Sequence, residues 1–164
     1  MEKERLRFCI ERFDHYYDTV NNKSNVQLAL SVFVTGGLIT LCPYLEQKVN
    51  CSATIHFLLG VEIFLGLGSV LLNLLATMPY LGTKNDSLHY FGSIAKLSKS
   101  QFFARSAKMN SGEEIEDLRA QVLALANGLK NKFSKLRVVS WLIIAQFIVA
   151  VPLLMLLYLN LKKQ

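Results

Sequence analysis

The chain is short, at 164 residues, and basic, with a formal net charge of +6 at neutral pH. A basic balance can indicate a nucleic-acid binder, but no basic strand interleaved with aromatic residues and no recognition helix accompanies it, so we expect no nucleic-acid partner. Three scattered cysteines are too few for a disulfide framework. Hydrophobic residues make up 52% of the chain and carry the strongest signal.

Three apolar stretches are each about as long as the roughly twenty residues that cross the hydrocarbon core of a bilayer. They cover residues 26–45, 54–78 and 138–160. We therefore predict an all-α integral membrane protein, a helical bundle with three transmembrane helices. Roughly eighty residues remain outside the spans, which is small for an independent domain, so we expect residues 1–164 to form a single unit.

Basic residues are distributed unevenly around these spans. Of the eighteen lysines and arginines, five precede the first span and ten lie between the second and the third. Because basic residues near membrane ends stay in the cytoplasm, we expect residues 1–25 and 79–137 to be cytoplasmic and the loop Glu46 to Ala53 to lie outside. Cys42 and Cys51 fall near that outer face, where they either form a disulfide or serve as small apolar residues.

An apolar stripe at alternating spacings of four and three precedes the first span. It consists of Leu6, Ile10, Phe13, Tyr17 and Val20. Such a narrow stripe packs one face of a helix against another helix. No proline or glycine interrupts it, so we predict one long helix from about Lys3 to Leu41, half cytoplasmic and half in the membrane, which Pro43 ends.

A second stripe precedes the third span. It consists of Ile115, Leu118, Val122, Leu125, Leu129 and Leu136. Ser111 and Glu114 form a capping-box pattern that marks the start of this helix, which we expect to continue unbroken into its span, with a kink at Pro152. Two such helices, rooted in the membrane on the same side, are expected to pack together or against neighbouring subunits, so we predict a homo-oligomer.

The segment from Met78 to Asn110 is the least regular part of the chain, and Pro79 opens it. Residues 88–97 are amphipathic and fit either a strand or a helix. Ser98 and Gln101 form a second capping-box pattern, which predicts a short helix after them.

Polar residues interrupt the apolar spans. In the second span they are spaced by four, three and four and therefore share one helix face: Glu62, Gly66, Ser69 and Asn73. Because a carboxylate is costly in hydrocarbon, one hypothesis is a stripe that faces a pore or a subunit. The other is close helix packing through small and polar residues, with Glu62 protonated or hydrogen-bonded within the bundle. Gln146 in the third span is an isolated amide typical of interhelical hydrogen bonds, and Gly36 with Gly37 is typical of close packing or of a flexible point.

Basic residues cluster where the third span begins, at Lys130, Lys132, Lys135 and Arg137. Several cations that converge near a low dielectric can hold an anionic ligand, and Asn21, Asn22 and Lys23 before the first span are candidates to close the same pocket. The alternative is that membrane topology alone explains the charges.

Catalytic patterns are missing from the sequence. It contains no phosphate-binding glycine loop, no cysteine pair with zinc spacing and no nucleophile elbow. Asp14, His15 and Asp18 have too few ligands for a structural metal site and are expected to form a solvated face. We therefore expect no catalytic residues, no metal and no cofactor, and the chain is not expected to be an enzyme.

Three groups of residues recur together in one family. The first is Asn21 to Asn25, which leads into the apolar run Leu28 to Leu38. The second is Tyr90 to Ser98 with Phe102, and the third runs from Asp117 to Val122 and then from Lys132 to Arg137. In this order and with three spans, the chain resembles the transmembrane effector family of Pycsar anti-phage systems, which is similar to the broader SLATT class. Family relatives commonly carry Asp-x-Lys-Ala at the first motif, where this chain matches only at Lys23.

The resemblance implies an effector in the bacterial inner membrane. Such an effector responds to a cyclic pyrimidine nucleotide, cUMP or cCMP, which a partner cyclase makes during phage infection, and it then impairs membrane integrity. Residues 21–23, 132, 135 and 137 are then the candidates for ligand binding or coupling, and the polar residues of the second and third spans for the membrane path. The alternative function is a non-conducting membrane anchor or scaffold that recruits a cytoplasmic partner through its helices. A small transporter is disfavoured because the span count is odd and inverted repeats are missing.

Overall fold

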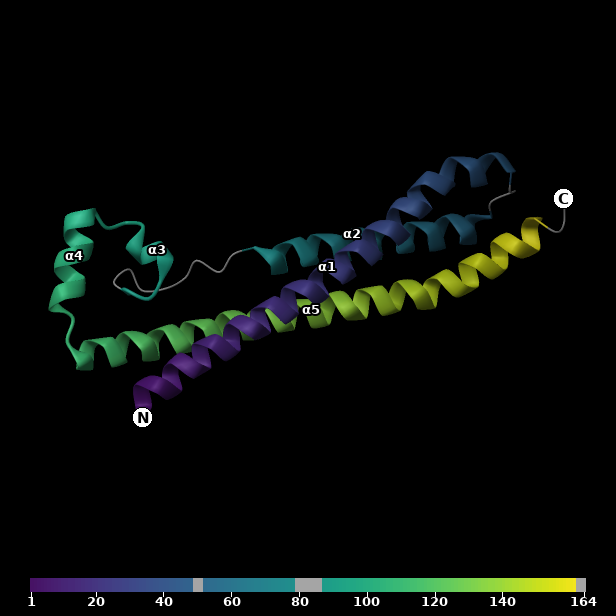
Figure 1. The fold of residues 1–164 in the computed structure, drawn as a ribbon. Helices are drawn as coiled ribbons and strands as arrows, with labels where there is room; N and C mark the ends of the chain where they lie inside the picture. The colour runs from purple at the N-terminus through teal and green to yellow at the C-terminus, as the bar shows by residue number, and fades with distance from the viewer. Residues whose placement is uncertain (49–51, 79–86, 162–164) are drawn as a thin grey trace. The chain divides into compact units, whose positions relative to one another are not determined.

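The computed structural model describes residues 1–48, 52–78 and 87–161, which form helices and no strand. In chain order these are α1 (Glu2–Lys48), α2 (Ala53–Thr77), α3 (Phe91–Ile94), α4 (Lys99–Lys108) and α5 (Ser111–Leu161) (Figure 1). The predicted all-α fold with three membrane-spanning helices is confirmed, because α1, α2 and α5 are each long and apolar enough to cross a membrane.

The chain divides into two compact units. Unit 1 consists of the described residues of Met1–Val20 and Pro79–Lys132, and unit 2 of those of Asn21–Met78 and Phe133–Gln164. The first part of α1 and the first part of α5 belong to unit 1, whereas their second parts belong to unit 2 together with α2. Both long helices therefore run without interruption from one unit into the other.

In unit 1 the two long helices run in the same direction, because residues early in α1 contact residues early in α5. Lys3 Nζ lies 2.6 Å from Glu114 Oε2, and the Tyr17 hydroxyl donates a hydrogen bond of 3.0 Å to the Leu125 carbonyl. Leu6 and Val20 of the first predicted apolar stripe are buried, as are Leu118 and Leu129 of the second. The predicted pairing of the two helices is therefore present within one protomer.

Two exposed ion pairs join the same helices near their N-terminal ends. Arg7 Nη2 lies 3.1 Å from Glu114 Oε1, so Glu114 receives two cations. Arg119 donates to Glu2 Oε1 through both Nε and Nη2, at 2.8 and 2.7 Å. The hydrogen bond from Lys3 is the main reason that the pKa of Glu114 lies below its ordinary value.

The irregular segment of unit 1 resolves into helical turns. Residues 88–97, which fitted either a strand or a helix, contain the short helix α3. Ser98 and Gln101 form the predicted capping box at the start of α4, where Ser98 Oγ accepts from the Gln101 backbone N–H and Gln101 Oε1 accepts from that of Ser98. Asp117 Oδ2 accepts a hydrogen bond of 2.9 Å from the Leu88 backbone N–H, which ties this segment to α5.

The predicted capping box at the start of α5 is wrong by one residue. Asn110, not Ser111, holds the capping position: its Oδ1 accepts from the Glu113 N–H at 2.9 Å, and Glu113 Oε2 accepts from the Asn110 N–H at 3.3 Å. Glu114 is thereby released from capping and pairs with α1 instead. Both residue pairs have the required spacing, and the tertiary ion pairs select between them.

The prediction that Pro43 ends the first helix is also wrong. α1 continues through Pro43 to Lys48, and α5 likewise continues through Pro152 to Leu161. A proline removes one backbone donor, and spanning helices accommodate this loss through neighbouring groups. The proposed partner of Cys42, Cys51, lies outside the described residues, as does Pro79.

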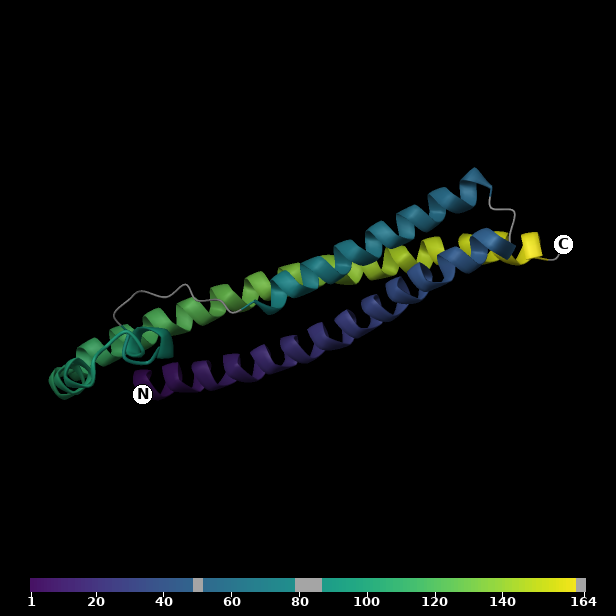
Figure 2. The same cartoon turned by 90° about the horizontal axis from the view of Figure 1, so that it is seen from above.

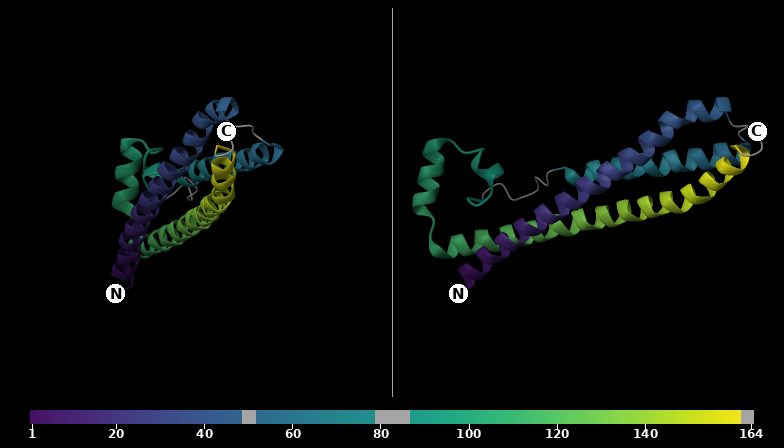
Figure 3. Two further views of the ribbon diagram at one scale, coloured as in Figure 1. Left: turned by 90° about the vertical axis from the view of Figure 1, so that its right-hand side faces the viewer. Right: turned by 45° about the vertical axis from the view of Figure 1, so that its right-hand side comes forward.

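In unit 2, α1 and α5 run in the same direction and α2 runs beside them in the opposite direction, as Figures 1 and 2 show from two sides. Figure 3 gives the same three helical segments from two further directions. Gln27 on α1 donates a hydrogen bond of 2.7 Å to Ser140 on α5, and Asn73 near the end of α2 pairs with Ser24 on α1. Unit 2 is therefore a three-helix bundle.

The side chains of unit 2 are distributed as lipid requires, with apolar groups outside. Glu62 is 0% exposed, whereas Phe64 on the same helix is 76% exposed. Phe33 on α1 and Trp141 on α5 also face outward. Lipid tails accept apolar surface but offer no hydrogen bonds, so polar side chains of a spanning bundle belong in its interior.

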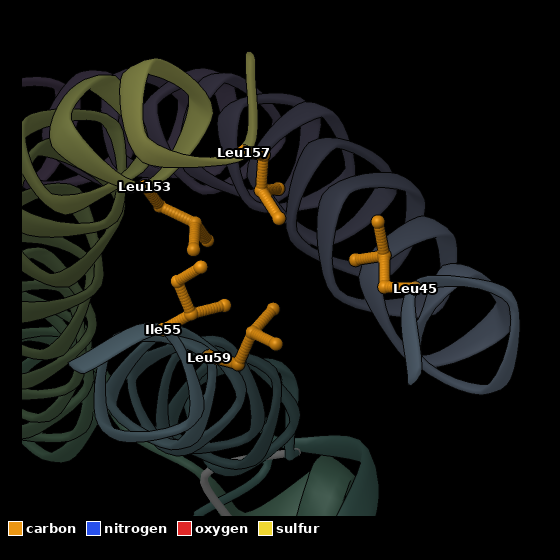
Figure 4. Close-up of a cluster of buried hydrophobic side chains, with 5 residues drawn as sticks. All are labelled: Leu45, Ile55, Leu59, Leu153 and Leu157. Carbon is orange, nitrogen blue, oxygen red and sulfur yellow. The ribbon is translucent and has the colours of Figure 1, made fainter. Parts of the chain in front are cut away.

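An apolar cluster closes one end of unit 2. It consists of Leu45 on α1, Ile55 and Leu59 on α2, and Leu153 and Leu157 on α5. Figure 4 shows these five side chains pointing toward one another from the three helices. Cys42 packs against this cluster as a partly buried apolar residue. The cluster therefore joins all three helices at this end without any polar contact between its members.

The ion pairs at Glu114 lead to a prediction about pH. Because the pKa of Glu114 is lower in the folded chain than its ordinary value of 4.5, its stabilising contribution is present above that value and is lost as the pH falls through the lowered one. Glu114→Gln should therefore lower the thermal midpoint of the detergent-purified protein at pH 7, and the difference from wild type should shrink as the pH falls below 4.5. Glu116→Gln, which changes an exposed glutamate on the same helix, is the matched control. If Glu114→Gln lowered the thermal midpoint by the same amount at pH 7 and below pH 4.5, this account would be contradicted.

Candidate functional site

The buried residues of α2 form one continuous stripe along the helix. They are Ile55, Leu59, Glu62, Gly66, Ser69, Asn73 and Ala76, at spacings of four and three throughout. This is the period of a helix that packs along one seam. The four polar or small residues singled out from the sequence thus lie in the middle of this stripe, buried inside unit 2.

The seam meets polar residues on both other helices, and we call this set the polar core. Its members are Ser24, Gln27, Ser31 and Thr35 on α1, Glu62, Ser69 and Asn73 on α2, and Ser140 and Gln146 on α5. Seven of these nine residues are buried and the other two, Gln27 and Ser140, are half-buried; Glu62, Ser69 and Asn73 are 0% exposed. The interior of the bundle is therefore polar over much of its length.

At one end of the polar core, Ser24 on α1 and Asn73 on α2 form a reciprocal pair. The Ser24 hydroxyl donates to Asn73 Oδ1, and Asn73 Nδ2 donates a hydrogen bond of 3.1 Å to the Ser24 backbone carbonyl. Next to it, Gln27 Nε2 donates to Ser140 Oγ, which in turn donates to the Leu136 carbonyl at 2.9 Å. These bonds satisfy polar groups that lipid could not satisfy.

Gly66 lies where α1 and α5 both approach α2 closely. A Cβ atom at this position would overlap Thr35 Oγ1 on α1 and would lie 2.7 Å from Gln146 Nε2 on α5. Gln146 Nε2 also donates a hydrogen bond of 3.3 Å to the Glu62 backbone carbonyl. By contrast, a Cβ at Gly36 or Gly37 meets no atom within 4 Å, so these two glycines do not pack closely against the described part of the chain.

Glu62 lies at the opposite end of the polar core, between Gly66 and the apolar-cluster residue Leu59 on α2. Neither of its carboxylate oxygens has a hydrogen-bond partner among the described residues, and the same holds for the hydroxyls of Ser31 and Thr35. Buried polar groups without partners are rare in folded proteins and call for an explanation. Close helix packing accounts for Gly66 and Asn73, but it does not account for Glu62.

Sequence reasoning missed the contribution of α1 to this core. Ser24, Ser31 and Thr35 are spaced by seven and four and therefore lie on one helix face, which continues the apolar stripe that ends at Val20. That spacing was available in the sequence, but serine and threonine are common throughout membrane helices and draw attention only when their partners are known.

The basic residues predicted to hold an anion have separate contacts. Lys132 belongs to unit 1, where its Nζ lies 5.5 Å from the centre of the Tyr17 ring. Lys135 belongs to unit 2 and donates a hydrogen bond of 3.0 Å to the Leu75 carbonyl, one of the last carbonyls of α2. A lysine is favourable at a helix C-terminus, where backbone carbonyls lack partners. Arg137 is exposed.

The residues before the first span lie on the surface. Asn21, Asn22 and Lys23 are exposed on α1 at the start of unit 2. Within residues 1–48, 52–78 and 87–161, no group of three or more His, Cys, Asp or Glu side chains could hold a metal ion. Among the described residues, the polar core is therefore the set of candidate residues that the structure buries and brings together.

The comparisons with known proteins give one match. A family model described as the Pycsar effector protein domain matches residues 5–159, which is nearly the whole chain. The searches of curated proteins and of solved structures return no match.

The close approach at Gly66 can be tested with two alanine substitutions. Gly66→Ala places a methyl group against Thr35, whose branched side chain is stiff, so we expect a loss of about 1–3 kcal/mol of stability from overpacking. Gly60→Ala lies on the same helix where a Cβ meets nothing within 4 Å, and it should be neutral or stabilising by up to about 1 kcal/mol. Thermal unfolding in detergent measures both, and similar midpoints for the two variants would argue against tight packing at Gly66.

Proposed function

The chain belongs to the Pycsar effector family and is a Pycsar anti-phage transmembrane effector, and from this premise we propose that a cyclic pyrimidine nucleotide activates it to impair the bacterial inner membrane. The family implies a functional link to a cyclase through a second messenger. We further propose that the active form is a homo-oligomer and that residues 1–25 and 79–137 face the cytoplasm, as the distribution of basic residues favours.

The observation that carries this proposal is the continuity of α1 and α5. Each begins in unit 1, where ion pairs and an apolar seam hold it against the other, and each continues as one helix into unit 2. A ligand that favours a different packing of the helix pair in unit 1 would therefore shift the same helices where they span the membrane. Since the messenger is made in the cytoplasm, sensing belongs to unit 1 or to its junction with the spans.

The ligand chemistry supports a role for the basic residues near that junction. A cyclic nucleotide carries one phosphate, which cationic side chains recognise through charge-assisted hydrogen bonds. We propose Arg137 as the main phosphate contact, because guanidinium groups bind phosphate in a bidentate manner, with supporting roles for Lys23, Lys135, Asn21 and Asn22, which belong to the same unit. We propose a coupling role for Lys132, which lies beside Tyr17 in unit 1. The polar residues Glu62, Gly66, Ser69, Asn73 and Gln146 are proposed to supply the membrane path.

Binding can be tested directly. We expect the purified wild-type protein to bind cUMP or cCMP in calorimetric titration, and Arg137→Ala to weaken binding about tenfold or more because it removes a charge-assisted contact. Lys108→Ala, which removes an exposed basic residue of α4, is the matched control and should bind normally. Equal affinity of the Arg137→Ala variant and the control would remove Arg137 from the site.

The effector action can be tested in cells. Co-expression with an active pyrimidine cyclase should depolarise the membrane, whereas a catalytically inactive cyclase should not. The double variant Glu62→Leu with Asn73→Leu should lose depolarisation at normal expression, since it removes the polar path. A non-conducting scaffold predicts unchanged polarisation with the wild type, and that result at good expression would refute the nucleotide-gated effector.

A further inference from the structure

Glu62 is the one acidic residue within residues 26–45, 54–78 and 138–160, and it is fully buried in unit 2. A charged carboxylate at membrane depth costs several kcal/mol unless a positive charge or hydrogen bonds compensate it. The described residues supply neither, because both carboxylate oxygens lack a hydrogen-bond partner. The helix packing of the bundle therefore does not explain why a carboxylate occupies this position.

The neighbouring groups are oxygen donors of the kind that bind hard cations. The Thr35 hydroxyl on α1 is 3% exposed for its residue, has no hydrogen-bond partner among the described residues, and lies against Gly66, one helical turn from Glu62. Gln146 on α5 reaches the same place and donates to the Glu62 carbonyl at 3.3 Å. Thr35 on α1 and Gln146 on α5 thus both lie within one helical turn of Glu62 on α2. The carboxylate of Glu62 and the hydroxyl of Thr35 have oxygen atoms without a partner among the described residues.

We propose that Glu62 and Thr35, with Gln146 beside them, form a buried binding site for one monovalent cation, either a proton or Na⁺. One carboxylate brings one negative charge, so a monovalent cation leaves the site neutral, whereas a divalent ion would leave a net charge in the low dielectric. The facing polar groups, Thr35 on α1 and Gln146 on α5, do not titrate, so Glu62 is the group whose charge the cation balances. This site goes beyond the effector function, because it exists in the bundle before any signal arrives.

The site is tested on the detergent-purified full chain without any nucleotide. The thermal midpoint of the wild type and of Glu62→Gln is measured from about pH 8 to about pH 5, in sodium chloride and in choline chloride of equal concentration. If Na⁺ binds, the wild-type midpoint should rise by about 3–6 °C at a sodium concentration roughly tenfold above its Kd, and Glu62→Gln should show no rise. If a proton binds, the wild-type midpoint should rise relative to Glu62→Gln as the pH falls, in both salts.

Two further variants complete the design. Glu116→Gln, which changes an exposed glutamate, should keep the wild-type response. Thr35→Val keeps the shape and the Glu62 charge but removes the hydroxyl, and it should raise the cation concentration for the half-maximal effect about tenfold. This second variant also decides the matter if Glu62→Gln does not fold.

The site is refuted if the difference between wild type and Glu62→Gln is the same at every pH and in both salts, or if Thr35→Val responds like the wild type. Because the measurement involves no cyclic nucleotide and no membrane potential, such a result would leave the effector proposal standing.

Discussion

The structure of unit 2 depends on polar side chains that satisfy one another inside a bundle whose outside is apolar. Lipid tails are as apolar as the side chains of the spans, so burying apolar residues inside the bundle contributes little free energy. Association of the spans therefore rests on close packing and on interhelical hydrogen bonds. The Ser24 and Asn73 pair fixes α1 against α2, and the Gln27 and Ser140 bond fixes α1 against α5. Gly66 then lets the three helices approach where Thr35 and Gln146 meet. The apolar cluster of Figure 4 completes the bundle at the other end.

Different interactions hold α1 against α5 in the two units. In unit 1, exposed ion pairs such as Arg119 with Glu2 join α1 to α5, and water and salt screen such pairs, so each contributes little by itself. In unit 2 the same two helices meet through a part-buried hydrogen bond between Gln27 and Ser140, for which lipid tails offer no competing partner. Unit 1 is therefore the easier part to rearrange, which suits the sensing role that we propose for it.

The helical period of the apolar residues predicts the helices correctly. Where two neighbouring capping patterns have the same spacing, the sequence does not distinguish them. The Ser98 and Gln101 capping box, predicted from its spacing, is present at the start of α4. At the start of α5, Asn110 with Glu113 and Ser111 with Glu114 have the same spacing, and the contact of Glu114 with α1 decides between them. Proline lacks a backbone donor, so the sequence predicts a helix end at Pro43, whereas α1 continues through it to Lys48.

By itself, the sequence determined the helical class, the three spans and the face of α2 that carries Glu62, since each follows from hydrophobic length or from helical period. Only the tertiary structure decided what that face meets, because contacts between α1, α2 and α5 join residues that are 49 to 113 positions apart. Ser24, Ser31 and Thr35 look like ordinary membrane-helix residues until α2 is placed against them. For the same reason, only the folded bundle shows that the carboxylate of Glu62 has no hydrogen-bond partner among the described residues.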